Sequence, residues 1–363
     1  MDLFALTARG LENICAAEMA RFGLTVGEIG YRRIHAQARG DLRPLLRPLL
    51  RPLLRPLLRP LLRQLLTLST ADDIFLEVSR WSAIGHTKAA LDTLRELAAQ
   101  LDLYSALAVC TQLRPVDRRP VFSVTANFVG KRNYSSDEIK TALAAGIEAS
   151  TGWTYSADDG VAALNVRIFV EHDEALVGVR LGATPLHRRS YKQEQRPGSL
   201  KPPIAAALLE LLDLPPGATL LDPCCGAGTI LIEAARRGAL ARGGDNDADA
   251  VAATEANVEN AGIDLSVEQW DARSLPLPNS SVDAIACNLP WDRQVSIDGD
   301  EATFYAELCA EMERVLAPGG RVALLTNKPA LLQFQRLSCL EEIEISLFGQ
   351  RPTIGVYGSK NDH

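Results

Sequence analysis

The tetrapeptide Asn288-Leu289-Pro290-Trp291, which directly follows the apolar segment Val282–Cys287, has the residue types needed to hold an amine on a planar ring. The amide oxygen of Asn288 and a backbone carbonyl at Leu289 or Pro290 can accept the two amine hydrogens, which aims the nitrogen lone pair at an electrophilic methyl group. The indole of Trp291 offers a stacking face worth about 1–3 kcal/mol. Residues that hold the amine in this way would accelerate the reaction mainly by positioning the two reactants. We therefore predict Asn288, Pro290 and Trp291 as catalytic residues. The alternative is a strand that ends in an Asn-Pro turn over a core tryptophan.

A second candidate site is the turn Asp222–Thr229, where Gly226 and Gly228 follow a short apolar segment. Glycines let the backbone come close to a ligand and turn sharply into a helix. The exposed N–H groups at a helix start favour a carboxylate, such as that of an amino-acid moiety. Since packing also selects glycine, this turn alone indicates only a nucleoside-bearing cofactor.

Acidic residues follow at the ends of the next two predicted strands. Asp245, about 20 residues beyond the glycines, is predicted to accept hydrogen bonds from ribose hydroxyls, whereas Asp247 is predicted to cap the helix that begins at Ala248. Asp271 is predicted to accept from an adenine amino group, with a loop or cap residue as its alternative. The glycine turn differs from GxGxxG, so an NAD-type dinucleotide is less suited to it.

Alternating strands and helices after residue 200 place these candidates at strand ends. Such alternation predicts a doubly wound parallel sheet. The predicted elements are Thr219–Asp222, Thr229–Gly238, Gly243–Asp245, Ala248–Ala261, Val267–Trp270, Val282–Asn288, Phe304–Leu316 and Arg321–Thr326. Before them, Leu186–Pro203 is rich in Arg, Lys, Gln and Pro and is interpreted as a polar connector.

The amino-terminal part also mixes strands and helices. The predicted strands are Leu3–Thr7, Ile74–Val78, Val121–Asn127, Ala163–Glu171 and Ala175–Leu181, and the predicted helices are Gly10–Phe22, Ala89–Ala99 and Ser136–Thr151. The sequence Arg-Pro-Leu-Leu recurs from Arg43 to Leu62 and is followed by Arg63-Gln64-Leu65-Leu66. Proline at every fourth residue disfavours a regular helix. We interpret the repeat as an inserted surface loop without a function, the alternative being arginine contacts to phosphates.

Charge is unevenly distributed along the 363 residues. Residues 1–200 carry a net charge of +5 and residues 201–363 one of −12, which together give −7. The seven cysteines form no CxxC pair, so neither a disulfide framework nor a zinc site is expected. No signal peptide and no membrane span are expected either. A cytoplasmic location fits this composition best.

At this point the sequence resembles a known family. Asp222–Ala235 (DPCCGAGTILIEAA) and Asn288–Trp291 (NLPW) resemble motifs of the Rossmann-like methyltransferases that modify guanine N2 in RNA. Leu186–Ala207 resembles the segment before the catalytic domain in that family. Val121–Leu181 looks like a THUMP domain, an RNA-binding module, and residues 1–80 resemble the ferredoxin-like domain that accompanies it. The nearest members are tRNA guanine-N2 methyltransferases that act on guanosine 6 of the acceptor stem.

The resemblance implies an α/β fold in which ferredoxin-like and THUMP domains precede a Rossmann-like methyltransferase domain. The implied domains are a ferredoxin-like domain at 1–80 with the repeat insertion at 43–66, a THUMP domain at 81–183, a linker at 184–203 and a methyltransferase domain at 204–363. The implied substrate is tRNA, with its target base flipped out of the duplex. The basic amino-terminal half would then supply backbone affinity that falls with salt. A monomer without an obligatory protein partner is expected.

The resemblance implies S-adenosyl-L-methionine (SAM) as cofactor and no metal. The residues predicted to line the cofactor site are Asp222, Cys224, Gly226, Gly228, Thr229, Asp245, Asn246, Asp271, Ala272 and Asn288. The residues predicted to contact RNA are Lys131, Arg132, Arg188, Arg189 and Arg293. Asp292 stands where the family usually has glycine, and Arg293 would compensate by pairing with a phosphate.

Other functions remain open from the sequence. The same chemistry could act on guanosine 10 of tRNA, on a guanine of ribosomal RNA or on adenine N6 in DNA, although the THUMP-like half argues against DNA. An RNA-binding protein with a decayed catalytic site is the alternative from a different class. The presence of Asp222, Asp245, Asn288 and Pro290 argues against decay.

Overall fold

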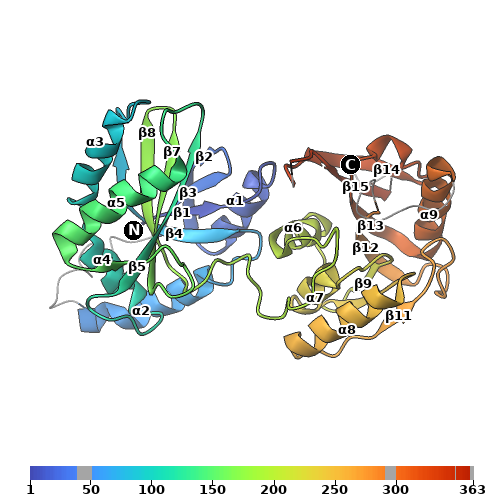
Figure 1. The fold of residues 1–363 in the computed structure, drawn as a ribbon. Coiled ribbons are helices and arrows are strands. Elements are labelled where there is room, and N and C mark those ends of the chain that lie inside the picture. The colour runs from blue at the N-terminus through green and yellow to red at the C-terminus, as the bar shows by residue number, and fades with distance from the viewer. Residues whose placement is uncertain (39–50, 291–299, 348, 360–363) are drawn as a thin grey trace. The chain divides into compact units, whose positions relative to one another are not determined.

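The computed structural model describes residues 1–38, 51–290, 300–347 and 349–359 (Figure 1). The chain divides into two compact units. The amino-terminal unit comprises Met1–Leu6, Ala16–Leu68 and Asp72–Leu186, and the carboxy-terminal unit comprises Thr7–Cys15, Ser69–Ala71 and His187–His363. No helix of the described residues is long and apolar enough to cross a membrane.

One eight-stranded sheet organises the amino-terminal unit, in the order β2-β3-β1-β4-β8-β7-β5-β6. Its strands are β1 (Asp2–Leu6), β2 (Leu24–Gly30), β3 (Arg33–Ala38), β4 (Asp73–Trp81), β5 (Val121–Val129), β6 (Thr154–Tyr155), β7 (Leu164–Glu171) and β8 (Glu174–Arg180). The antiparallel pair β4–β8 joins strands from the predicted ferredoxin-like and THUMP segments into this single sheet. The division at residue 80 into two domains stays a prediction.

The helices of this unit begin where local signals are strongest. They are α1 (Glu12–Arg21), α2 (Arg51–Leu65), α3 (Ala89–Ala98), α4 (Leu103–Cys110) and α5 (Ser136–Thr151). Ser135 and Glu138 form a reciprocal capping box at the start of α5, which satisfies two N–H groups that the helix leaves unpaired. The predicted helix Ser136–Thr151 is therefore confirmed with its bounds.

The loop interpretation of the Arg-Pro-Leu-Leu repeat is wrong for residues 51–65, which form α2. A period of four is close to the 3.6 residues of a helical turn, so a column of leucines drifts only slowly around the helix. Leu58, Leu62 and Leu65 are buried, and burial of a leucine side chain contributes about 1.5–3 kcal/mol. Hydrophobic docking of α2 thus offsets the backbone hydrogen bonds that proline removes. Residues 43–50 of the repeat lie outside the described residues.

A mixed seven-stranded sheet organises the carboxy-terminal unit, in the order β11-β10-β9-β12-β13-β15-β14. Its strands are β9 (Thr219–Asp222), β10 (Leu240–Asp245), β11 (Val267–Gln269), β12 (Val282–Asn288), β13 (Leu316–Thr326), β14 (Leu337–Glu344) and β15 (Thr353–Ser359). The predicted parallel, doubly wound arrangement is confirmed from β11 to β13. It is incomplete at the other edge, because β15 runs antiparallel to both β13 and β14.

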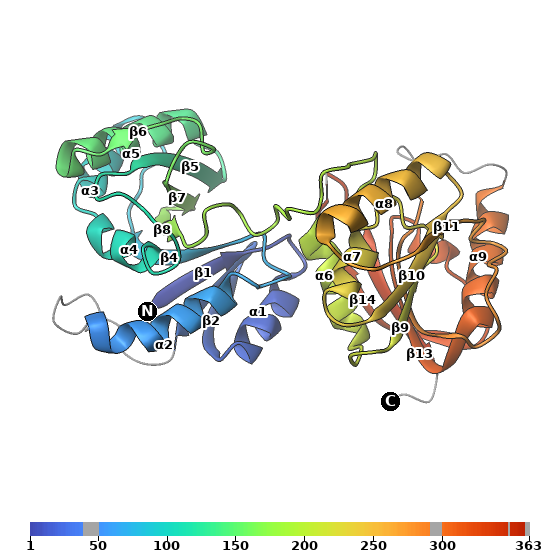
Figure 2. The same cartoon turned by 90° about the horizontal axis from the view of Figure 1, so that it is seen from below.

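Helices cover both faces of this sheet (Figure 2). They are α6 (Pro202–Leu212), α7 (Thr229–Ala235), α8 (Ala248–Ala261) and α9 (Glu301–Val315), with a short 3-10 helix at Pro329–Leu331. Leu220 and Ala284 face a core that includes α6 and α7, whereas Leu221 and Ile285 face a core that includes α9. Neighbouring residues of β9 and β12 thus point alternately into the two cores, as expected for strands that are buried on both faces. The start of α6 at Pro202 corrects the predicted connector, which extended to Pro203.

Leu62 provides a direct test of the docked helix α2. It is fully buried, and its neighbour Leu61 is partly exposed. We expect Leu62→Ala to lower the free energy of unfolding by about 2–5 kcal/mol, and Leu61→Ala to lower it by about 1 kcal/mol or less. Urea unfolding followed by circular dichroism measures both. Equal effects of the two substitutions would contradict the docking of α2.

Candidate active site

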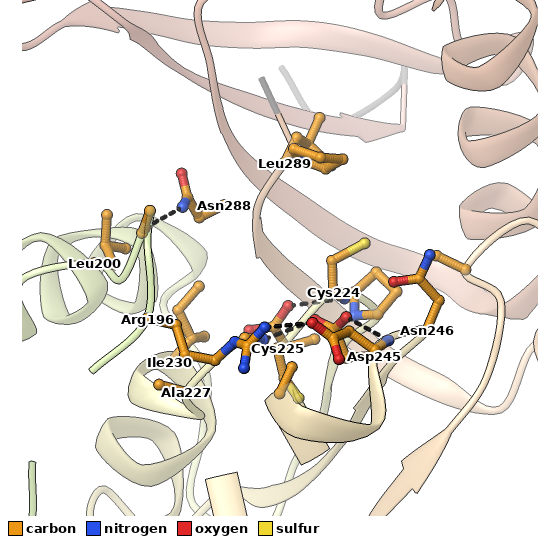
Figure 3. Close-up of a pocket in the computed structure, with 18 of the residues that line it drawn as sticks. Arg196, Leu200, Cys224, Cys225, Ala227, Ile230, Asp245, Asn246, Asn288 and Leu289 are labelled. Carbon is orange, nitrogen blue, oxygen red and sulfur yellow. Dashed lines mark hydrogen bonds and ion pairs between the residues drawn. The ribbon is translucent and has the colours of Figure 1, made fainter. Parts of the chain in front are cut away.

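A cavity of about 380 Å³ lies at the carboxyl ends of β9, β10 and β12 in the carboxy-terminal unit (Figure 3). In open α/β sheets ligands bind beyond these strand ends, where the strand order reverses. Most residues predicted for the cofactor or the reaction line it: Asp222, Cys224, Gly226, Thr229, Asp245, Asn246, Asp271, Ala272, Asn288 and Pro290. Gly228 is not among the lining residues. Trp291, Asp292 and Arg293 lie outside the described residues.

The pairing of β9 with β12 brings the two candidate motifs together. Leu220 pairs with Ala284 and Leu221 with Ile285 in parallel register. Asp222 and Asn288 therefore both follow paired segments at the same edge of the sheet, although 66 residues separate them. The first is fully buried and the second partly exposed.

The two glycines of the turn have different reasons to be glycine. Both have positive φ, 56° at Gly226 and 74° at Gly228. A Cβ at Gly226 would meet no atom within 4 Å, whereas one at Gly228 would lie 2.5 Å from Cγ2 of Thr254 on α8. Gly226 thus keeps the backbone open beside the cavity, and Gly228 permits close packing of α7 against α8. The prediction that both glycines serve ligand approach therefore lacks support at Gly228.

Two carboxylates organise the backbone of the cavity. The N–H of Gly226 donates to Oδ2 of Asp245 at 2.9 Å, and the N–H of Asp247 donates to Oδ1 of the same carboxylate at 3.1 Å. The N–H of Cys224 donates to Oδ1 of Asp222 at 3.3 Å. Burial raises the pKa of Asp222 to about 7, and the charge of Asp245 acts in the same direction. Asp222 is therefore the carboxyl group here whose ionisation responds most to a nearby cation.

Asp247 caps α8 as predicted, because its carboxylate accepts from the N–H of Asp249 at 2.9 Å. Asp271 is exposed and lines the cavity, and its role toward adenine stays a prediction. Its two oxygens accept hydrogen bonds from the Arg273 guanidinium at 2.7–3.2 Å, and these bonds lower the pKa of Asp271. The Arg273 cation also lies over the ring of Phe304, which lines the cavity.

The backbone and side chain of the Asn-Leu-Pro segment are held from three directions. Nδ2 of Asn288 donates to the carbonyl of Gly198 at 3.1 Å, and Oδ1 is the accepting atom of this amide. The N–H of Leu289 donates to the carbonyl of Leu325 at 3.0 Å. The hydroxyl of Tyr305, a residue that sequence reasoning missed, donates to the carbonyl of Pro290 at 2.9 Å. The segment is thus rigid before any substrate arrives.

The connector before α6 packs on the turn and on α7. Its Tyr191 hydroxyl and Arg189 guanidinium both reach Oε1 of buried Glu233, at 2.8 and 3.1 Å. Lys192 donates to Oγ1 of Thr229 at 2.8 Å and to the carbonyl of Leu200. Burial lowers the pKa of Lys192 to about 8. The connector therefore forms a wall of the site.

A second set of contacts fixes the same connector. Oδ1 of Asn257 on α8 accepts from the N–H groups of Gln193 and Glu194 at 3.0 and 2.9 Å. Arg196, which lines the cavity, forms an ion pair with Asp247. Lys192, Arg196 and Asn257 were missed because only their partners, far away in sequence, give them a role.

The residues predicted to contact RNA have unequal freedom to do so. Lys131 and Arg188 are exposed. Arg189 is held by Glu233 and by the carbonyl of Ser69. Arg132 donates to the carbonyls of Ile84, Gly85 and His172 and to the Tyr134 hydroxyl. Arg132 and Arg189 therefore already form hydrogen bonds within the protein, and any contact that they make to RNA would come in addition to these bonds.

The carboxy-terminal part of the chain is similar to known proteins. Residues 189–347 match the model of the UPF0020 family, described as an RMKL-like methyltransferase domain. The chain is 35% identical over 216 residues to a tRNA (guanine(6)-N2)-methyltransferase of Thermus thermophilus, which covers 58% of this chain and 64% of that enzyme. It is 34% identical over 171 residues to a U6 snRNA (guanine-N(2))-methyltransferase of Mus musculus, which covers 45% of this chain and 31% of that enzyme. The matched stretches thus span less than two thirds of these curated relatives.

The fold has a solved counterpart. The crystal structure of TrmN from Thermus thermophilus superimposes with a TM-score of 0.75 at 26% sequence identity, covering 99% of both chains. The chain is therefore similar to TrmN over its full length, including the amino-terminal unit.

Proposed function

Since residues 189–347 match the model of the UPF0020 family, an RMKL-like methyltransferase domain, we propose that the chain is a SAM-dependent methyltransferase acting on the N2 amine of a guanosine in tRNA. Guanosine 6 of the acceptor stem is the favoured target, because the Thermus relative carries that name and the fold matches TrmN. The observation that carries the proposal is the cavity shared by the Asp222 turn and the Asn288 segment. Another guanine, at position 10 of tRNA or in ribosomal RNA, is the alternative target for the same chemistry.

The cavity suits a cationic nucleoside. Four aspartates line it, Asp222, Asp245, Asp247 and Asp271, against two arginines. The open space beside Gly226 admits a ligand close to the backbone. The Asp245 carboxylate has lone pairs beyond those used by two backbone N–H groups and can accept from ribose hydroxyls. Bound SAM would supply an electrophilic methyl group on a sulfonium.

The chain's own residues then orient the guanine amine. Oδ1 of Asn288 accepts one amine hydrogen, while its Nδ2 stays on Gly198. The carbonyl of Pro290, with a second lone pair beyond the one used by Tyr305, accepts the other. Both bonds direct the amine lone pair toward the cofactor side of the cavity, and Trp291 would stack on the base. Catalysis by this arrangement is positioning of the two reactants.

RNA binding is assigned to the amino-terminal unit, as a THUMP-type module. The amino-terminal unit carries a net charge of +2, and the connector at 187–200 adds +3. This positive charge supports RNA binding, because phosphate contacts provide most sequence-independent affinity for RNA. We further propose that the protein works in the cytoplasm as a monomer.

Asp222 gives the cofactor proposal a pH signature. Its pKa of about 7 in the unliganded site means that the carboxyl is mostly protonated at pH 6 and mostly ionised at pH 8. Because the ionised form attracts the cationic cofactor, we expect SAM affinity to rise about tenfold over this range. Isothermal titration calorimetry at several pH values measures it. Asp222→Asn should bind weakly and without this rise, and equal pH profiles for the two proteins would contradict the role of Asp222.

Incubation of unmodified tRNA transcripts with methyl-labelled SAM tests the reaction itself. We expect one labelled guanosine, at position 6, carrying the methyl on N2. Asn288→Ala should lower the rate at least about 100-fold, since it removes an acceptor used in orienting the amine. Its tRNA affinity, measured by filter binding, should stay within a factor of two.

The outcomes of this experiment separate the alternatives. If the label is found on N2 of another guanosine, the proposed reaction stands and that guanosine replaces guanosine 6 as the target. Absence of label together with absence of SAM binding would refute the enzyme proposal in favour of a decayed RNA-binding protein. Equal loss of rate and tRNA affinity in Asn288→Ala would assign Asn288 a structural role.

A further inference from the structure

A cleft in the amino-terminal unit is lined by arginines from two elements. It has a volume of about 620 Å³ and lies between α2 and the segment Thr111–Pro115 that follows α4. Figures 1 and 2 show α2 and α4 as neighbours in both views. Arg59 and Arg63 enter it from α2, and Arg114 enters it from the opposite side. Three arginines are thus among the residues that line one open space.

None of these three arginines has an acidic partner among the described residues. Arg59 and Arg63 are exposed, and the described lining residues include no Asp or Glu. Arg114 is half-buried and donates to the carbonyls of Ala163 and Gly182. Its Nε is buried without a hydrogen-bond partner. Burial lowers the pKa of Arg114, and the cation of Arg180 acts in the same direction. An anion held beside Arg114 would favour its charged form and so offset the lowering of its pKa.

The arginines elsewhere in the same unit provide the contrast. Arg33 pairs with Glu28 and Glu171, and Arg80 pairs with Glu28 and Glu77. Arg180 pairs with Asp73 and Asp159. These three arginines are neutralised by carboxylates, whereas Arg132, like Arg114, is held by carbonyl oxygens. The cleft differs from the surroundings of Arg33, Arg80 and Arg180 in that no described carboxylate pairs with its three arginines.

The helix α2 presents its two arginines together. Arg59 and Arg63 are four residues apart, so their side chains lie on the same face of the helix. Leu58, Leu62 and Leu65 form a separate, buried side of the helix. The helix dipole favours a cation at Arg63 in the last turn. It does not explain why Arg63 and Arg114 line the same cleft. The period of the repeat thus yields one leucine face for docking and one arginine face toward the cleft.

We propose that this cleft binds backbone phosphates of the RNA substrate, with Arg59 and Arg63 as the contacting residues and Arg114 as the buried charge beneath them. Arginine guanidinium groups match phosphate oxygens in bidentate geometry. The inference rests on the proposed function for the identity of the polymer. It assigns to the Arg-Pro-Leu-Leu repeat a role in substrate affinity rather than that of a tolerated insertion.

The test compares two double variants of the full chain that lose the same charge. Arg59→Gln with Arg63→Gln removes both contacts. Arg95→Gln with Lys140→Gln removes two cations on α3 and α5, of which Arg95 is exposed and Lys140 is partly exposed. Each is paired with an acidic neighbour. Binding of an unmodified tRNA transcript is measured by fluorescence anisotropy from low to high salt. We expect the cleft variant to bind about tenfold more weakly, with a slope of log Kd against log salt about 1.8 smaller.

Three readouts keep the result interpretable. Arg59→Lys with Arg63→Lys should retain the wild-type salt slope, because it keeps both charges. Melting temperatures should agree closely among all variants, since Arg59, Arg63 and Arg95 are exposed and Lys140 is partly exposed. The methylation rate at saturating tRNA should be unchanged in the cleft variant. Equal weakening in the cleft variant and the control, with wild-type methylation intact, would overturn the cleft proposal alone. Absence of tRNA binding and methylation in the wild type would overturn the proposed function as well.

Discussion

The parallel pairing of β9 with β12 is the constraint on which the site depends. It brings the carboxyl ends of two strands together although 66 residues separate Asp222 from Asn288. Alternate residues of both strands are buried on opposite faces, Leu220 and Ala284 with α6 and α7, and Leu221 and Ile285 with α9. A shift of one residue in either strand would exchange these faces. Hydrophobic burial on both faces thus fixes the distance between the turn after Asp222 and the Asn-Leu-Pro segment.

Polar contacts then convert this register into a rigid cavity. Asp245 holds the backbone of the turn, and Tyr305 and Gly198 hold the Asn-Leu-Pro segment. Glu233 and Asn257 hold the connector that contributes Gly198. Because Tyr305, Glu233 and Asn257, which support the residues that line the cavity, are buried, little ordering of these residues would remain to be done if a ligand bound there. This is the arrangement expected where catalysis consists of positioning.

Local signals decided which parts of the sequence could be predicted. The capping box at Ser135, the turn at Asp222 and the apolar strand Val282–Asn288 carry their information within a few residues, and their bounds match the structure. The start of α6 was missed because its two prolines read as a connector, although proline is favoured in the first turn of a helix. The antiparallel strands β14 and β15 depend on pairing that no local pattern encodes.

The remaining gaps have the same physical cause. Tyr305 and Lys192 act through partners 15 and 37 residues away, so their residue types alone did not distinguish them. Helix α2 was misjudged because proline was weighed as a local helix breaker, while the leucine face that anchors it needs the rest of the unit to be buried. Asp271 was predicted as a ligand contact from its position after a strand. In the structure its carboxylate also accepts hydrogen bonds from Arg273, two residues later, which the sequence pattern did not indicate.

The most direct test of the central claim is a crystal structure of the protein with S-adenosylhomocysteine. The ligand should occupy the cavity between the Asp222 turn and Asp245, with its ribose hydroxyls on Asp245 and its sulfur facing Asn288. Binding elsewhere, or with the sulfur turned away from Asn288, would contradict the claim that the β9–β12 pairing brings cofactor and target amine together.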